Sequence, residues 1–472
     1  MKVRFELGLF DPIADQPLWK LGAKDIGTGA AAALNLRAAQ ESLVLVQNPL
    51  VSGGKGGGQL EGGAAGAASR VLPLRAGQKL AVLGPHGNAT RQLIQVDTGR
   101  ICASGELDCF PSTLTELARL NGLAGGTTTF VQGVDVVDNS TAGIAAAVAA
   151  AEAADVVVLG LGIGNCGGWW VNEGDHGCGE RTGAAGAFLE GETHDRTSID
   201  LPPQQHALAA AVLALGKPTA IYLLNGGSVA LEPELRHAAN PPAVIEAFYP
   251  GAAGATALAQ SLFGAANRWG RMPYTVYRAG WAANNSMLEM EVATSRRTYR
   301  YGADALVRFG TGLSLSSFGL GFAKNGEGGG AGAVGAGDAG AAAAAAATLR
   351  TDGSSADLVV ALTVTNRGPL AGDAVVMAYF HPLDVPLPLH PVVSLFNFTR
   401  LSDIAVGAAA SASFAINTRA LLLATADGDL VSAPGAYKLT FEDGAGAVVT
   451  VPLQLTGEQV TVEPFPQPPR KK

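Results

Sequence analysis

Residues 155–163, DVVVLGLGI, form an almost wholly apolar segment that directly follows an alanine-rich helical pattern at residues 142–154. Such a run is typical of a central strand in a parallel sheet, where both faces of the strand are buried. The same alternation of strand and helix recurs on both sides of this segment. Strands that alternate with helices of about ten to fifteen residues predict a layered α/β sandwich with a largely parallel sheet.

The remaining elements of this domain are predicted from short apolar runs and from helical patterns. We expect helices at residues 28–42, 113–120, 204–215 and 254–263, and strands at residues 43–47, 79–83, 127–131, 218–224 and 243–248. Open α/β sheets bind their ligands where the carboxyl ends of the strands open into loops. The loops that follow these strands are therefore the first place to look for a site.

One of these loops is unusually charged. Residues 189–202, LEGETHDRTSIDLP, place six ionisable side chains within eleven positions of a chain in which only 15% of residues are charged. The strand at residues 155–163 leads into this loop, so its carboxylates belong to the ligand-binding edge of the sheet. A solvated surface loop and a ligand site both fit the cluster, because burying such groups unpaired is costly.

The glycines at residues 160–164 follow a strand, as they do in dinucleotide-binding proteins. Residues 165–170, NCGGWW, do not form a helix start, so the helix N-terminus that would hold a phosphate is missing. We therefore interpret these glycines as a glycine-rich turn.

A second domain is predicted after a Gly/Ala-rich linker at residues 324–348. Apolar and small or polar residues alternate with period two from residue 358 onward, and further short strands follow at intervals typical of a sandwich. Residues 349–457 are thus expected to form a C-terminal β-sandwich of the immunoglobulin or fibronectin type III-like class. The tail at residues 458–472 is expected to be disordered.

The overall charge restricts the partners. The formal net charge is −8 and no run of Lys or Arg occurs, which argues against nucleic acid and against an anionic membrane surface. No apolar run approaches the roughly 20 residues that a membrane span needs, and residues 1–10 lack the apolar core of a signal peptide. A neutral ligand is easier to accommodate.

The four cysteines form two close pairs in the sequence, Cys102 with Cys109 and Cys166 with Cys178. Two local disulfides are expected if the protein meets an oxidising compartment. A zinc site is the less favoured alternative, because zinc ligands usually come in pairs two to four residues apart.

Seven blocks in a fixed order resemble glycoside hydrolase family 3, in its β-xylosidase-like branch. They read RFELGLFDP, AAQESLVLVQN, KLAVLGPHGNAT, DVVVLGLGI, EGETHDRTSIDLPPQQ, AFYPGAAGATALAQSLFGAANRWGRMPYTVY and RRTYRYGADALVRFGTGLS. The resemblance implies that residues 1–27 are a remnant of the linker after a catalytic barrel. It further implies that residues 28–323 form the family's C-terminal α/β domain and that residues 349–457 form its fibronectin type III-like domain.

The family resemblance also implies a chemistry, which is retaining hydrolysis of β-linked xylosides or glucosides by two carboxylates. The family's nucleophile is an aspartate on an N-terminal (β/α)8 barrel, and its acid/base is a glutamate three positions before an Asp-Arg pair. In this sequence that motif places the acid/base at Glu192, with Glu190 as the fallback. No cofactor and no metal are implied.

Five further residues are candidates for contact with a sugar: Trp169, Trp170, His194, Asp195 and Arg196. The two tryptophans could stack on a sugar face, and packing within their own loop is the alternative. His194 could bind a hydroxyl or be structural. Asp195 and Arg196 are interpreted first as an ion pair that holds the loop, and second as ligand contacts.

The resemblance begins after the region in which the family carries its barrel. We therefore expect this chain to lack the nucleophile and to have little or no hydrolase activity by itself, with the missing barrel domain or a homo-oligomer as partner. Family members of this kind are extracellular or in the cell wall. A non-catalytic carbohydrate-binding or structural protein on the same scaffold remains the alternative.

Overall fold

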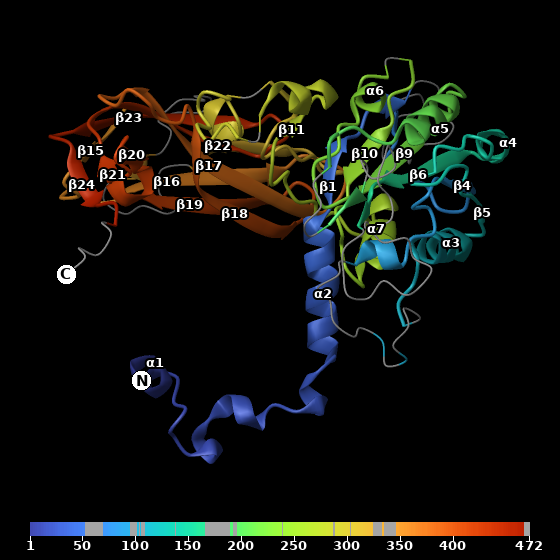
Figure 1. Ribbon diagram of the computed structural model, residues 1–472, viewed down its shortest axis with the longest axis horizontal. Coiled ribbons are helices and arrows are strands. Elements are labelled where there is room, and N and C mark those ends of the chain that lie inside the picture. The colour runs from blue at the N-terminus through green and yellow to red at the C-terminus, as the bar shows by residue number, and fades with distance from the viewer. Residues whose placement is uncertain are drawn as a thin grey trace.

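The computed structural model describes residues 1–51, 69–94, 102, 104, 109–136, 138–165, 189–191, 196–237, 239–286, 288–302, 304–323, 333–334 and 346–466. Two domains lie side by side in Figure 1, one of mixed helices and strands and one built almost entirely of strands. Helix α2 (Gly29–Ser42) projects from the first domain, and the segment before it stands apart from both domains. In the described part of the chain, no helix combines the length and apolarity needed to cross a membrane.

The first domain is organised around a six-stranded sheet. In spatial order its strands are β1 (Val44–Gln47), β10 (Ala243–Glu246), β9 (Thr219–Leu224), β6 (Val156–Gly162), β4 (Lys79–Leu83) and β5 (Thr127–Val131). Strand β1 runs antiparallel to β10, and the other neighbours are parallel, as the sequence predicts. Every residue of β6 and β9 is buried, because helices cover both faces of the sheet.

The helices form one layer on each face. Besides α2 they are α3 (Thr113–Leu123), α4 (Ile144–Ala153), α5 (Pro203–Leu213), α6 (Glu232–Leu235) and α7 (Gly254–Leu262). Helices α2, α3 and α7 pack together on one face, and α4 packs with α5 on the other. One apolar core lies on each face of the sheet, and successive residues of β4 point into them alternately. Leu80 and Val82 lie in the core on the side of α2, α3 and α7, and Ala81 and Leu83 lie in the core on the side of α4 and α5.

The glycines at residues 160 and 162 lie within β6, so the predicted glycine-rich turn is wrong. A Cβ on Gly160 would lie 2.5 Å from the Tyr222 hydroxyl and 2.7 Å from the backbone nitrogen of Gly87. The glycine is needed because the loop after β4 crosses the strand closely at this point.

The second domain contains two larger sheets around one apolar core. The first consists of β13 (Phe318–Phe322), β16 (Leu358–Asn366), β14 (Ala333–Val334) and β19 (Ala409–Ile416). The second runs β15 (Ala347–Arg350), β23 (Val448–Thr456), β22 (Gly435–Glu442), β17 (Gly372–Asp384) and β18 (Ser394–Ile404). Alternate residues of β16 are buried, which matches the period-two pattern of the sequence.

Two predicted boundaries need correction. Strand β13 pairs with β16, so residues 318–322 belong to the second domain and not to the α/β domain. Its two glycines hide the apolar alternation of Phe318, Leu320 and Phe322 in the sequence. The tail predicted to be disordered contains β24 (Val460–Glu463), which pairs with β21 (Leu430–Ser432) in a small sheet with β20 (Leu423–Ala424).

Two partly buried arginines join the two domains. Arg400 on β18 contacts Glu41 of α2 at 3.5 Å, the wholly buried carboxylate of Asp373 at 3.1 Å, and the carbonyl oxygen of Trp269. Arg271 of the first domain donates from Nε to the carbonyl oxygen of Asp443 in the second domain, at 2.7 Å. Because these groups have little access to water, the contacts depend on the two domains staying together.

Replacing Arg400 with alanine should therefore destabilise the whole chain. The change leaves Asp373 buried without its cation, which typically costs about 3–5 kcal/mol. The matched control is Arg419→Ala, whose ion pair with Glu463 is exposed and should be worth at most about 1 kcal/mol. Urea denaturation measures both variants, and equal losses would contradict the role of Arg400 as an interdomain contact.

Candidate active site

A cluster of polar side chains lies at the carboxyl ends of β9 and β10, where the charged loop meets the sheet. Strand β9 ends at Leu224 and is followed by Asn225, Gly226, Gly227 and Ser228. The described parts of the charged loop, residues 189–191 and 196–200, lie against this segment. We call residues 226–230 the β9 loop.

The carboxylate of Glu190 is held by several donors. Its Oε1 accepts hydrogen bonds from the Gly226 backbone at 2.5 Å and from the Tyr249 hydroxyl at 2.5 Å. Its Oε2 accepts from the Gly227 backbone at 2.7 Å and lies 3.9 Å from Nε of Arg196. The side chain is only 15% exposed. Both oxygens of this carboxylate are thus occupied as acceptors.

Arg196, six residues after Glu190 in the charged loop, also binds the β9 loop. Its Nη2 donates to the carbonyl oxygen of Ser228 at 2.7 Å, and the side chain is 9% exposed. Ile199 lies three residues after Arg196, and its carbonyl oxygen accepts a hydrogen bond from the backbone N–H of Ala230 at 2.7 Å. Burial lowers the pKa of Arg196 below its ordinary value, and the charge of Glu190 opposes that shift. Glu190 and Arg196 therefore form an ion pair docked on the β9 loop.

His206 on α5 supports the far end of this loop. Its Nε2 lies 2.9 Å from Oδ1 of Asp200, and its Nδ1 lies 2.8 Å from Oε1 of the buried Glu234 on α6. Burial alone would lower the pKa of His206, but the hydrogen bonds to the two carboxylates outweigh it and raise the pKa to about 9. At neutral pH the imidazolium therefore joins α5, α6 and the end of the charged loop.

Glu246 is the last residue of β10, the strand next to β9. Burial raises the pKa of Glu246 to about 8, and the charge of Glu190 adds to the rise. The carboxyl is thus mainly protonated at neutral pH. Strand β10 stops here, two residues before the predicted end, because Phe248 adopts a left-handed backbone with φ +52°. The turn brings Tyr249 to Glu190, while the Tyr274 hydroxyl lies 3.4 Å from Nδ2 of Asn225.

The loop after β4 contributes a buried histidine. Nε2 of His86 lies 3.2 Å from the carbonyl oxygen of Ile163 at the end of β6, and burial lowers the pKa of His86 to about 4. The histidine is therefore neutral, and it links the two loops where the strand order reverses between β4 and β6. Among the described residues, no group of three or more His, Cys, Asp or Glu side chains could hold a metal ion.

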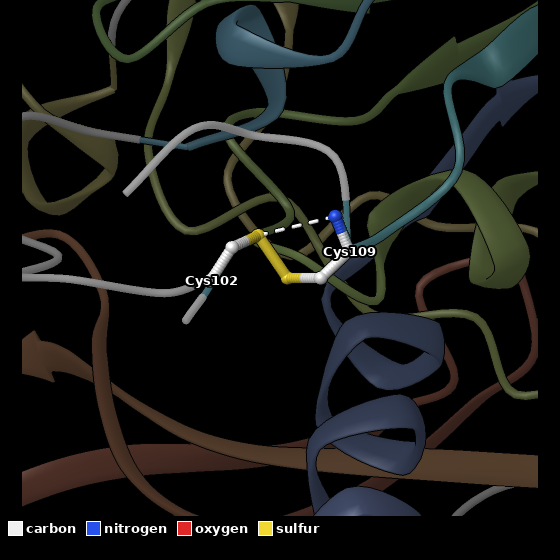
Figure 2. The surroundings of a disulfide bond; sticks show 2 residues. All are labelled: Cys102 and Cys109. Carbon is white, nitrogen blue, oxygen red and sulfur yellow. Dashed lines mark hydrogen bonds between the residues drawn. A yellow bond between two sulfur atoms is a disulfide. The ribbon is translucent and has the colours of Figure 1, made fainter. Parts of the chain in front are cut away.

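The predicted site residues divide into two groups. Glu190 and Arg196 come together as described. Those outside the described residues are Glu192, Trp169, Trp170, His194, Asp195, Cys166 and Cys178. Cys102 and Cys109 form a disulfide with their Cα atoms 5.5 Å apart (Figure 2).

Sequence reasoning missed several residues of the site, among them Asn225, Glu246 and Tyr249. Each follows or ends a strand that the sequence does predict, so the rule that ligands sit at carboxyl strand ends could have indicated them. Their approach to the charged loop depends on the left-handed turn at Phe248 and on the course of the β9 loop, which no local pattern specifies.

Residues 68–316 match the glycosyl hydrolase family 3 C-terminal domain, which is more than half of the chain. The chain belongs to glycosyl hydrolase family 3. Its curated family 3 relatives include a "probable exo-1,4-beta-xylosidase" of Aspergillus clavatus, 30% identical over 98% of this chain and 53% of the relative. Another of the same description from Neosartorya fischeri is 29% identical over 99% of this chain and 53% of the relative. The chain thus spans about half the length of the curated relatives it matches.

Solved structures of the family share the fold. A family 3 exo-β-xylosidase in complex with a xylobiose aziridine probe aligns with a TM-score of 0.75 at 22% identity, over 98% of this chain and 53% of that one. A β-glucosidase from Listeria innocua in complex with isofagomine aligns with a TM-score of 0.65 at 22% identity, over 97% of this chain and 54% of that one.

The buried carboxyl of Glu246 makes folding stability depend on pH. Its raised pKa means that the folded state keeps a proton that the unfolded chain loses near pH 4.5. The contribution of Glu246 to stability should therefore fall as pH rises from about 4.5 to about 8. Glu246→Gln mimics the protonated form, so its free energy of unfolding should equal that of the wild type near pH 4. Above pH 8 its free energy of unfolding should be higher than that of the wild type by on the order of 3–5 kcal/mol.

Urea denaturation over this pH range is the measurement. The exposed Glu458→Gln is the matched control and should track the wild type throughout. A Glu246→Gln variant that loses stability equally at all pH values would mean that the native state holds Glu246 ionised.

Proposed function

We propose that this chain supplies the acid/base half of a retaining β-glycosidase site, with Glu192 as the proton donor. The observation that carries the proposal is the anchoring of the charged loop on both sides of Glu192. Glu190 is fastened two residues before it and Arg196 four residues after it, and both dock on the β9 loop. A general acid needs a fixed position close to the leaving-group oxygen, which such anchors favour.

The contacts of Glu190 support Glu192 over the fallback. A general acid must carry a proton and direct it at the substrate. Glu190 instead accepts hydrogen bonds on both oxygens from backbone and tyrosine donors and lies beside the Arg196 guanidinium. These contacts hold both oxygens of Glu190 against the β9 loop and the Tyr249 hydroxyl. We therefore assign Glu190 an anchoring role and Glu192 the proton transfer.

The nucleophile is proposed to lie on the family's barrel. A retaining mechanism requires its two carboxyl groups about 5–5.5 Å apart across the scissile bond. The nucleophile attacks the anomeric carbon while Glu192 protonates the leaving oxygen, and Glu192 then accepts a proton from the water that releases the sugar. By this scheme residues 1–472 alone have little or no hydrolase activity.

The substrate is proposed to be a β-linked xyloside or glucoside at the end of a plant-type oligosaccharide. Relatives that match nearly the whole chain are described as exo-1,4-β-xylosidases, and a neutral sugar agrees with the net charge of −8. Trp169 and Trp170, which precede the charged loop, and His194 and Asp195 within it are proposed as sugar contacts. We also propose an extracellular or cell-wall location and assign the second domain to the fibronectin type III-like class.

The N-terminal segment is proposed to pack on the barrel. Large apolar side chains between residues 1 and 26 are more than half exposed, among them Phe5, Phe10 and Trp19. The rings of Phe5 and Phe10 contact each other with centroids 4.7 Å apart. Large exposed apolar side chains gathered in one segment are typical of an interaction site. The barrel is the partner that fits, because the family resemblance places this segment directly after it.

The identity of the proton donor is tested with Glu192→Gln in the full-length protein. The rate on substrates with poor leaving groups, such as xylobiose, should fall by about 10²- to 10⁴-fold, because these need protonation. The rate on dinitrophenyl β-xyloside should be largely spared. Glu152→Gln, an exposed change on α4, is the control and should be silent.

A wild-type rate of Glu192→Gln on both substrates would mean that another group is the acid. Turnover of an aryl β-xyloside by residues 1–472 alone, abolished by Glu192→Gln, would contradict the need for the barrel. Loss of hydrolysis with retained sugar binding in every form of the protein would favour the non-catalytic alternative.

The partner of the N-terminal segment is tested by replacing Phe5, Phe10 and Trp19 with serine. Residues 1–472 should self-associate at high concentration, and adding a separately expressed family barrel should convert them to a one-to-one complex. The serine variant should do neither. Analytical ultracentrifugation measures both, and an unchanged complex with the serine variant would contradict the assignment.

A further inference from the structure

The charged loop begins and ends at neighbouring points of the β9 loop. Glu190 accepts hydrogen bonds from the backbone N–H groups of Gly226 and Gly227. Arg196 donates to the carbonyl oxygen of the next residue, Ser228. Nε of Arg196 lies 3.9 Å from Oε2 of Glu190, so the loop is also closed directly. Glu190 and Arg196 are therefore held at a single place, the β9 loop.

We propose that Glu190 is a positioning residue for the acid/base loop and that the Tyr249 hydroxyl sets how firmly Glu190 is held. The proposal rests on the proposed function, in which Glu192 is the proton donor. Holding both flanking residues limits the conformations open to a short segment between them. Weakening either anchor should slow proton transfer by Glu192 without unfolding the domain.

Tyr249 is the part of this arrangement that can be removed most cleanly. Its hydroxyl donates to Oε1 of Glu190 at 2.5 Å, and removing it leaves the ion pair of Glu190 with Arg196 in place. Truncating Glu190 itself would leave the buried guanidinium uncompensated, which risks misfolding. The left-handed turn at Phe248 directs the chain toward Glu190 immediately before Tyr249. Strained non-glycine positions of this kind concentrate at functional sites.

Gly227 offers a second, independent way to disturb the arrangement. A Cβ at this position would lie 2.7 Å from Nη2 of Arg196 and 2.9 Å from Oε2 of Glu190. Gly227→Ala therefore displaces both anchors by steric contact and removes no polar group. Agreement between Gly227→Ala and Tyr249→Phe would exclude an effect peculiar to the lost hydroxyl.

Hydrogen–deuterium exchange on residues 1–472 tests the anchoring directly. In Tyr249→Phe and Gly227→Ala, the amides of residues 226 and 227 and of the segment 189–200 should exchange roughly ten- to a hundredfold faster, as expected for the loss of a hydrogen bond to a charged group. Tyr222→Phe is the matched control. It also removes a buried hydroxyl, bonded at 2.5 Å to the carbonyl oxygen of His86, but leaves Glu190 untouched.

The control should lower the melting temperature without changing exchange in the segment 189–200. Unchanged exchange of that segment in both Tyr249→Phe and Gly227→Ala would overturn the anchoring role.

Kinetics of the full-length protein test whether the anchoring matters for proton transfer. Tyr249→Phe should lower kcat on poor leaving groups by about tenfold or more, leave KM nearly unchanged and spare activated aryl glycosides. A merely structural role would lower all rates together. If Glu192→Gln shows the leaving-group dependence and Tyr249→Phe does not, the positioning role fails and the proposed function stands. If Glu192→Gln shows none, the proposed function fails, whatever the exchange data.

Discussion

The carboxylate of Glu190, held by the backbone of the β9 loop, is the interaction on which the candidate site depends. A buried carboxylate must be satisfied by donors, and here Gly226, Gly227 and Tyr249 supply them while Arg196 balances its charge. These groups come from three segments at the carboxyl edge of the sheet: the β9 loop, the turn after β10 and the charged loop itself. The site can therefore form only when β9, β10 and the charged loop are all in place.

The same edge of the sheet carries groups with opposite protonation. Glu246 is mainly protonated because of its burial, whereas His206 carries a charge because it lies between Asp200 and Glu234. Neither group could keep that state on the surface. Their environments give a neutral carboxyl at the end of β10 and a charged imidazole at the end of the charged loop. His206 supports the end of that loop through its contact with Asp200.

The second domain contacts the α/β domain through Arg400, which lies on its strand β18, and through the carbonyl oxygen of Asp443, which accepts from Arg271. Much of this arrangement follows from sequence patterns. The apolar run of β6 and the period-two alternation of β16 predict the two kinds of sheet, and the structure has both. Strand β13 escaped prediction because glycine is depleted in strands and Gly319 and Gly321 make up two of its five residues. Its pairing with β16 supplies the order that its sequence does not indicate.

The sequence by itself determined the order of helices and strands, the parallel sheet and the charged loop at its carboxyl edge, because these depend on local periodicity and on the direction of the chain. It put Glu190 and Arg196 in one loop, but it did not predict that both side chains bind the β9 loop. Only the tertiary structure decided that Gly226, Gly227 and Tyr249 meet this loop. Those contacts join residues up to 59 positions apart, and they arise from the packing of β9 against β10 and the turn at Phe248.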